Sequence, residues 1–233
     1  MIPKSLAECQ DWVAAHCHRD YYATTYRAME NDYLPHLCKI LEESWSLDPG
    51  EYDSLEVGPG WGTMAVWLAS RGWDVKLADL VPFGHYITRQ FVAALEEEFD
   101  CEVGFRQYDI CGEPMDLLHT NPGYKPDLVL MTQVLPHLKW SPIQAIKNLA
   151  AMTHPYGMCV LTALDRTAYP QIIPPYEHWY QVPGSGEPCQ ETVVTMYDEA
   201  DLKRLVEIGF GDIKVYRPER SSCLFAECRK PQF

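Results

Sequence analysis

The chain has 233 residues, of which 47% are apolar, and a formal net charge of -14. This length predicts one large domain or one domain with an added cap. No apolar run approaches the roughly 20 residues that cross a bilayer, and the start of the chain has no signal-peptide pattern, so we expect a soluble cytoplasmic protein with no membrane partner. The acidic charge disfavours nucleic acid as a partner, because affinity for nucleic acid depends largely on Lys and Arg that neutralise phosphates.

The nine cysteines indicate a reducing compartment. Their number is odd and none of them forms a CxxC pair, which is typical of reduced thiols. The cluster His16-Cys17-His18 matches no standard zinc spacing, so the sequence predicts no metal site.

Two helical stretches precede the main domain. Residues 5–18 predict a short amphipathic helix, and Ser5 and Glu8 form a capping-box pattern at its start. The pattern over residues 21–46 predicts a second helix, which Pro35 kinks or divides. We therefore expect residues 1–50 to form a helical cap or lid, and residues 51–233 to form the main domain.

From Tyr52 onwards, short apolar runs alternate with helical patterns. This alternation indicates βαβ units and a mostly parallel sheet with helices on both faces, which is a doubly wound α/β fold. The predicted strands cover residues 54–57, 75–78, 103–108, 128–132 and 158–163, and the predicted helices lie near residues 63–70, 83–98 and 140–152.

The chain closes with a helix near residues 198–208 and two strands at residues 212–216 and 223–228. The joint between these strands is too short for a parallel crossover, so they are expected to pair as an antiparallel hairpin. The predicted fold is therefore a seven-stranded α/β sheet, mostly parallel, with an antiparallel last strand.

An irregular stretch at about residues 165–193 is rich in proline and aromatic residues. Irregular stretches of this length are usually functional. Tyr176, His178 and Trp179 are candidates for a wall or lid that binds a substrate, and aromatic rings would also suit a cationic one. A local hydrophobic cluster is the alternative interpretation.

A glycine-rich loop follows the first strand, in the segment Glu56-Val57-Gly58-Pro59-Gly60-Trp61-Gly62. Glycines allow a tight turn and a close approach of the backbone to a ligand. The residues from Gly60 to Ala65 also match the G-x-G-x-x-A pattern of dinucleotide-binding loops. Glu56 favours another ligand, because an acidic residue before the first glycine suits a cofactor that carries an amino group and no pyrophosphate.

The pattern Glu56-x-Gly58-x-Gly60-x-Gly62 resembles the cofactor loop of class I (Rossmann-like) methyltransferases that use S-adenosylmethionine (SAM). The resemblance covers about residues 52–230 and includes the closing hairpin, which a dinucleotide enzyme would not need. It implies SAM as the cofactor and the following SAM-binding residues: Tyr22, Tyr26, Glu56, Gly58, Pro59, Gly60, Gly62, Asp79, Leu80, Asp109, Ile110 and Gln133.

The resemblance also implies a role for several of these residues. An acidic residue at the position of Asp79 binds the ribose hydroxyls in the family, and the pair Asp109-Ile110 resembles the pair that contacts adenine. Gln133 falls where the family lines the methionine part of the cofactor site. Taken singly, Asp79 or Asp109 could equally be a helix cap or a solvated charge.

Two residues after the later strands are candidates for the acceptor side. His137 is the candidate catalytic base, since it follows the fourth strand and ligands of open α/β sheets bind beyond the carboxyl ends of the strands. A base is needed only when the acceptor must lose a proton, as oxygen acceptors usually do. Asp165, after the fifth strand, is a candidate for substrate binding. A structural histidine and a structural carboxylate are the alternatives.

The residues after the fourth strand, Thr132-Gln133-Val134-Leu135, narrow the class of acceptor. Enzymes that methylate amino groups of nucleic acids typically carry Asp/Asn-Pro-Pro-Tyr/Phe at this place. The Pro-Cys of cysteine-dependent base methylation and the two glutamates of protein arginine methyltransferases are also absent here. We therefore expect methylation of a small-molecule substrate, with a protein or peptide substrate and a non-catalytic SAM-binding regulatory protein as alternatives.

Overall fold

The computed structural model describes residues 4–17, 22, 26–45, 52–80, 87–112, 125–138, 142–168 and 195–232. Its seven strands form a mixed sheet, which confirms the predicted α/β fold. The order of the strands across the sheet is β3 (Val103–Gln107), β2 (Asp74–Asp79), β1 (Asp53–Val57), β4 (Leu128–Met131), β5 (Met158–Leu164), β7 (Cys223–Pro231) and β6 (Phe210–Tyr216). The chain divides into two compact units, Met1–Gln107 and Tyr108–Phe233.

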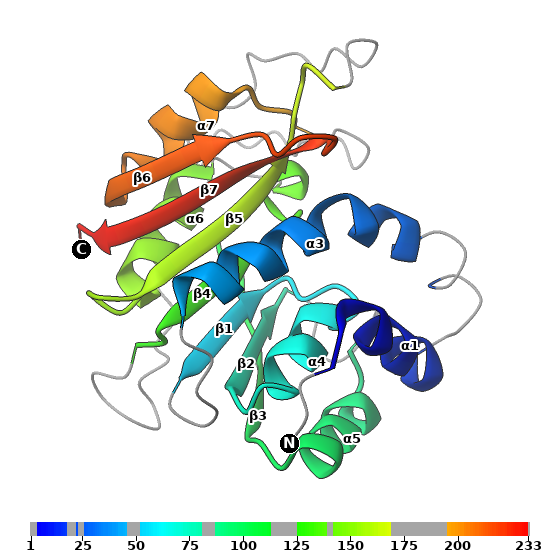
Figure 1. The fold of residues 1–233 in the computed structure, drawn as a ribbon. Coiled ribbons are helices and arrows are strands. Elements are labelled where there is room, and N and C mark those ends of the chain that lie inside the picture. Colours follow the sequence, from blue (N-terminus) through cyan, green and yellow to red (C-terminus); the bar gives the residue numbers. More distant parts are fainter. Residues whose placement is uncertain are drawn as a thin grey trace. The chain divides into compact units, whose positions relative to one another are not determined.

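In the first unit, β1 and β3 both pair with β2 in parallel, so the three strands present their carboxyl ends at the same edge. Among the described residues of this unit, Figure 1 shows the helices α1 (Leu6–His16), α3 (Arg27–Ser44), α4 (Thr63–Ala69) and α5 (Arg89–Phe99). Every residue of α4 is buried, because α1 packs against this helix and the helix packs against β2. The segment that follows β1 is therefore anchored at both of its ends.

The start of α1 is held by local and by distant contacts. Glu8 Oε2 accepts from the Ser5 backbone N–H at 2.7 Å, and the Glu8 backbone N–H donates to Ser5 Oγ, so the predicted capping box is confirmed. Arg71, directly after α4, has its guanidinium 3.5 Å from the centre of the Trp67 ring and donates to the Lys4 carbonyl at 3.1 Å. These contacts fix the N-terminal segment to α4.

Helices α3 and α5 test the predicted bounds in the first unit. α3 runs without a break from Arg27 to Ser44 with Pro35 inside it, and Tyr22 and Tyr26 ahead of it are also helical, of the π type. α5 begins at Arg89 and not at residue 83, because the Thr88 side chain caps it by accepting from the Phe91 N–H. Residues 81–86 lie outside the described residues.

In the second unit, β4 pairs with β5 in parallel, and β7 is antiparallel to both β5 and β6. Figure 1 shows β7 between β5 and β6, so the predicted closing hairpin is confirmed. The described part of this unit contains the short 3-10 helix η3 (Leu135–His137), α6 (Pro142–Met152) and α7 (Glu199–Val206), and α7 packs on β6 and β7. Among the described helices of the chain, none combines the length and the apolar character that crossing a bilayer requires.

Candidate functional site

The glycine-rich loop, residues 58–62, connects β1 to α4 at the carboxyl edge of the first unit's strands. The Gly58 N–H donates to the Ala78 carbonyl of β2 at 2.7 Å, and the Gly62 N–H donates to the Pro59 carbonyl at 2.8 Å. These two bonds give the loop a defined shape. Because the loop follows the carboxyl ends of the strands, it lies where ligands of open α/β sheets bind.

Gly60 and Gly62 face opposite kinds of surroundings. Both have a positive φ, of 54° and 81°, which residues with a side chain rarely adopt. A Cβ placed on Gly62 would lie 2.6 Å from Phe91 Cζ and 2.7 Å from Ile87 Cδ1, so Gly62 is required for packing against α5. A Cβ on Gly60 would meet no atom of the described residues within 4 Å. The Gly60 side of the loop is therefore open to a ligand.

Glu56, two residues before the loop, is a buried carboxylic acid in β1. Only 2% of its surface is exposed, and its Oε2 has no hydrogen-bond partner among the described residues. Burial, and secondly the charge of Glu30, raise the pKa of Glu56 to about 8. A buried oxygen without a donor is costly, so this position favours a ligand that brings an N–H group or a positive charge.

Glu30 on α3 joins the N-terminal part of the chain to the loop, and the sequence analysis missed it. Its carboxylate accepts from Tyr22 Oη at 2.7 Å, from Thr63 Oγ1 at 2.8 and 3.0 Å, and from Gln10 Nε2 at 3.4 Å. Burial raises the pKa of Glu30, and the hydrogen bonds from Tyr22, Thr63 and Gln10 oppose that rise. Thr63 is the first residue of α4, so Glu30 holds the end of the loop.

The sequence does contain a signal for Glu30. It occupies the same helical stripe as Leu34, Leu37 and Leu41, which are all buried. A carboxylate in such an apolar stripe is buried, and a buried carboxylate needs hydrogen-bond donors. The donors come from residues that are distant along the chain, which explains why the pattern alone did not identify them.

Tyr22 and Tyr26, both predicted to contact cofactor or substrate, lie against the loop residue Trp61. The ring centres are 5.4 Å apart for Tyr22 and 5.5 Å apart for Tyr26. Tyr22 is fully buried and its hydroxyl donates to Glu30. The two tyrosines therefore cover one side of the loop, and their contact with a ligand stays a prediction.

Asp79 and Leu80 lie at the carboxyl end of β2, as predicted. Asp79 is half-buried, whereas Leu80 is 56% exposed. Gln107 at the end of β3 donates to the Leu80 carbonyl at 3.1 Å and fixes the backbone there. Leu80 thus offers an apolar surface that a flat ring can cover.

In the second unit, Asp109 and Ile110 begin a tight turn after β3. The Asp109 side chain is exposed and its Oδ1 accepts from the Cys111 N–H at 2.9 Å, while the Gly112 N–H donates to the Asp109 carbonyl. Ile110 is buried. One carboxylate oxygen of Asp109 is therefore used to shape the turn.

Gln133 follows β4 in a strained backbone conformation. Its φ is +56°, and its backbone N–H and its Nε2 both donate to Thr162 Oγ1, at 2.9 and 3.0 Å. Nε2 also donates to Cys223 Sγ at 3.1 Å. Left-handed backbone at a non-glycine residue is concentrated at functional sites and persists only where neighbours hold it, as they do here.

His137 ends the 3-10 helix η3, which its backbone N–H stabilises by donating to the Val134 carbonyl. The side chain is exposed, and partial desolvation by the surrounding protein lowers its pKa. A lowered pKa keeps the imidazole neutral near pH 7, and a neutral imidazole can accept a proton. A role of His137 as a base stays a prediction.

Asp165 has its carboxylate oxygens engaged by protein groups. Oδ1 accepts from the Thr167 N–H at 2.8 Å, and Oδ2 accepts from Thr167 Oγ1 at 2.8 Å and lies 3.0 Å from Arg217 Nη1. The residue is buried. The structure therefore shows Asp165 shaping a turn and pairing with Arg217, while a contact with substrate stays a prediction.

The aromatic candidates Tyr176, His178 and Trp179 lie outside the described residues.

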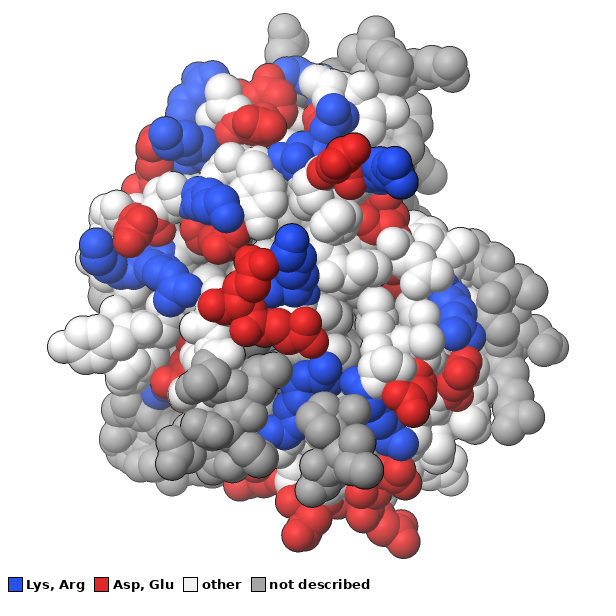
Figure 2. Space-filling model, in the orientation of Figure 1, with Lys and Arg blue, Asp and Glu red and all other residues white. Residues whose placement is uncertain are grey.

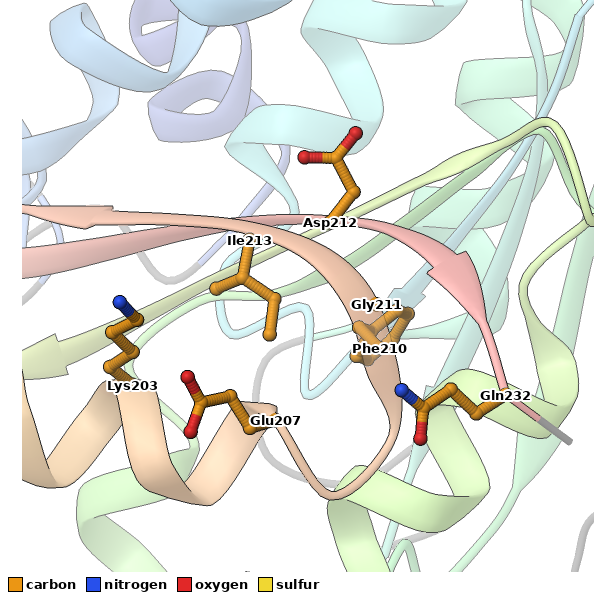
Figure 3. A pocket seen from close by; sticks show the side chains of 7 residues that line it. All are labelled: Lys203, Glu207, Phe210, Gly211, Asp212, Ile213 and Gln232. Carbon is orange, nitrogen blue, oxygen red and sulfur yellow. The ribbon is translucent and has the colours of Figure 1, made fainter.

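A pocket, shown in Figure 3, lies between α7 and the strands β6 and β7, and it is lined by Lys203, Glu207, Phe210, Gly211, Asp212, Ile213 and Gln232. None of the predicted site residues lines this pocket. The described residues also contain no group of three or more His, Cys, Asp or Glu placed to hold a metal ion.

Comparisons with known proteins agree with the fold. A family model described as a methyltransferase domain matches residues 26–211. Magnesium protoporphyrin IX methyltransferase from Synechocystis, solved with bound S-adenosylhomocysteine (SAH), is 16% identical with a TM-score of 0.57, and the match covers 96% of this chain and 94% of that one. No curated protein sequence matches the chain.

Two further solved structures share the fold. A protein from Pyrococcus horikoshii is 15% identical with a TM-score of 0.61, over 91% of this chain and 94% of that one. A SAM-dependent methyltransferase from Aquifex aeolicus is 15% identical with a TM-score of 0.52, over 97% of this chain and 98% of that one. At these identities the likeness shows a common fold.

Proposed function

The chain belongs to the SAM-dependent methyltransferases, and on this premise we propose that it transfers the methyl group of SAM to a small molecule. The observation that carries the choice of acceptor is the segment Thr132-Gln133-Val134-Leu135 after β4, which lacks the motifs of enzymes that methylate nucleic acids. The net charge of -14 supports the same choice, and Figure 2 shows Lys and Arg scattered among Asp and Glu on one face of the molecule. Such a surface is unfavourable for a polyanion.

The donor end of SAM fits two features of the first unit. Glu56 Oε2 is buried and has no partner among the described residues, so it can accept from the amino group of SAM. The open side of Gly60 leaves room for the cofactor next to the backbone. We place the remaining contacts at the residues that the family resemblance indicates: Tyr22, Tyr26, Gly58, Pro59, Gly62, Asp79, Leu80, Asp109, Ile110 and Gln133.

The roles of the outer contacts follow from their chemistry. Asp79 accepts from the ribose hydroxyls, since one carboxylate can bind two neighbouring hydroxyl groups. Leu80 and Ile110 contact the adenine ring, and Asp109 accepts from the adenine amino group. When bound, SAM supplies a methyl group on a sulfonium leaving group, so the protein accelerates transfer largely by positioning the acceptor in line with that methyl group.

The acceptor atom can be nitrogen, oxygen or sulfur, and for an oxygen acceptor His137 takes the proton of the hydroxyl through its neutral imidazole. The lowered pKa of His137 supports this role, because a base must be unprotonated before it acts. The N-terminal helices and the insertion at about residues 165–193 position the acceptor, with Asp165, Tyr176, His178 and Trp179 as the contact residues.

The first experiment is a calorimetric titration of the purified protein with SAH. We expect binding in the micromolar range, and we expect Gly60→Arg to abolish it, since the arginine side chain would fill the open side of the loop. Intact binding by a folded Gly60→Arg protein would contradict the assignment of the loop as the cofactor site.

The second experiment identifies the class of acceptor. The protein is incubated with methyl-labelled SAM and a cell lysate that has been divided into a small-molecule and a macromolecular fraction, and purified candidates are then screened by release of SAH. Label in the small-molecule fraction supports the proposal. Label in protein supports a protein methyltransferase, and SAH binding without turnover on either fraction supports a regulatory SAM-binding protein.

A further inference from the structure

Asn148 of α6 is a buried polar residue in a helix whose other buried positions are mostly apolar. Only 1% of its surface is exposed, and it lies among Ala145, Ile146, Leu149 and Ala150 on the buried part of the helix. An amide in such a place is unfavourable unless its donors and its acceptor are bonded. The bonds that Asn148 makes therefore explain its position.

Both the amide nitrogen and the amide oxygen of Asn148 are hydrogen-bonded. Asn148 Nδ2 donates to the Ile110 carbonyl at 2.8 Å and to the Gly112 carbonyl at 3.0 Å. Asn148 Oδ1 accepts from Gln144 Nε2 at 2.9 Å, one turn earlier in α6. The side chain thus clamps two carbonyl groups of the turn after β3, although 36 and 38 residues separate it from them in the sequence.

The clamped turn is the one that presents Asp109. Within the turn, Asp109 Oδ1 accepts from the Cys111 N–H and the Asp109 carbonyl accepts from the Gly112 N–H, both at 2.9 Å. These local bonds fix the turn internally, whereas Asn148 fixes it to the core of the second unit. A carboxylate on an exposed turn becomes a precise acceptor only when the turn itself is held in place.

We propose that Asn148 is a positioning residue for the adenine end of the cofactor, and that it acts by holding the turn at residues 109–112 so that Asp109 meets the adenine amino group. This inference rests on the proposed function, in particular on the contact between Asp109 and adenine. According to this proposal, Asn148 helps the protein to bind adenine more tightly than a purine that lacks the amino group.

The test compares two ligands in calorimetric titrations. One is SAH, and the other is the SAH analogue in which hydrogen replaces the adenine amino group. The wild-type protein is expected to bind SAH about tenfold more tightly than the analogue, which corresponds to one hydrogen bond to a charged group. Asn148→Leu is expected to weaken SAH binding about tenfold and binding of the analogue less than about threefold, so that discrimination is lost.

Thr153→Val is the matched control. Thr153 is buried near the end of α6 and its Oγ1 donates to the Leu149 carbonyl at 2.7 Å, so its replacement also removes a buried hydrogen bond of this helix. Since that bond does not involve residues 109–112, this variant should keep the wild-type ratio of the two affinities. Asn148→Ser, which retains one donor, serves if Asn148→Leu does not fold, and it should show a smaller loss of discrimination.

The outcomes separate this inference from the proposed function. An equal loss of affinity for both ligands in the Asn148 variants, or no loss, overturns the role of Asn148 while leaving the methyltransferase assignment intact. Equal affinity of the wild-type protein for both ligands also overturns it, because Asp109 would then not read the amino group. Failure of the wild-type protein to bind either ligand contradicts the proposed function itself.

Discussion

Replacing Gly60 and Gly62 one at a time with alanine should separate ligand binding from stability within a single loop. Both residues have a positive φ, so each alanine introduces the same kind of backbone strain. The two added methyl groups differ in what they meet, which is open space at Gly60 and the side chains of Phe91 and Ile87 at Gly62. Each variant therefore serves as the control for the other, since the backbone strain is common to both and only the surroundings of the methyl group differ.

The magnitudes follow from these contacts. Left-handed backbone at alanine costs about 1–2 kcal/mol, which applies to both variants. At Gly62 the methyl carbon would lie 2.6 Å from Phe91 Cζ, and relieving such overpacking costs a further ~1–3 kcal/mol. For a chain of this size, Gly62→Ala should lower Tm by about 4–20 °C and Gly60→Ala by about 2–8 °C.

Thermal unfolding and a titration with SAH, run well below both midpoints, measure the two effects. Gly60→Ala should weaken SAH binding at least about tenfold, or ~1.4 kcal/mol, because its methyl group occupies the side of the loop that faces the cofactor. Wild-type affinity in a folded Gly60→Ala protein would refute the idea that the open side is the cofactor side. A Gly62→Ala protein as stable as Gly60→Ala would refute the packing argument.

Three further predictions concern charged groups. Glu56 has its pKa raised to about 8 and holds a proton below that pH, so binding of the SAH ammonium must release it, and affinity should rise between pH 6 and 8 by up to about tenfold per unit. Glu56→Gln should flatten this profile. In the cofactor-free protein, the same variant should no longer show the fall in stability that the wild-type protein shows as pH rises towards 8. An unchanged binding profile would exclude Glu56 as the amino-group contact. For an oxygen acceptor, His137→Ala should reduce turnover at least about 100-fold, and a near wild-type rate would remove His137 as the base. Arg217→Met leaves the buried Asp165 without its ion pair and should lower the free energy of unfolding in urea by about 1–3 kcal/mol; a variant as stable as the wild-type protein would argue against the pairing.

Local signals predicted the elements of the fold well. The alternation of apolar runs located all seven strands of the sheet to within a few residues, and the Ser5 and Glu8 pattern correctly marked the start of α1. The start of α5 was misplaced because the interpretation followed the helical pattern and overlooked the capping hydroxyl of Thr88. Errors of this kind concern ends of elements, where one side chain decides the boundary.

The residues that hold the candidate site in place were not predicted. Glu30 and Asn148 are polar residues on helices, and the bonds by which they hold the loop and the turn join them to Thr63 and Ile110, which are 33 and 38 positions away. Their partners are defined by tertiary packing, which no local pattern records. The loop glycines, in contrast, carry their signal in the order of the sequence itself.

The bonds of Glu30 have a consequence for any attempt to divide the protein. A fragment that begins at residue 51 would keep all seven strands but would lose the acceptor of the Thr63 hydroxyl and both tyrosine rings that pack on Trp61. Thr63 would then lose both Glu30 and Tyr22, the side chains that its hydroxyl contacts at the end of the glycine loop. The sheet is thus a poor guide to where the protein can be cut, because the smallest piece that retains an ordered loop includes the helices that precede it.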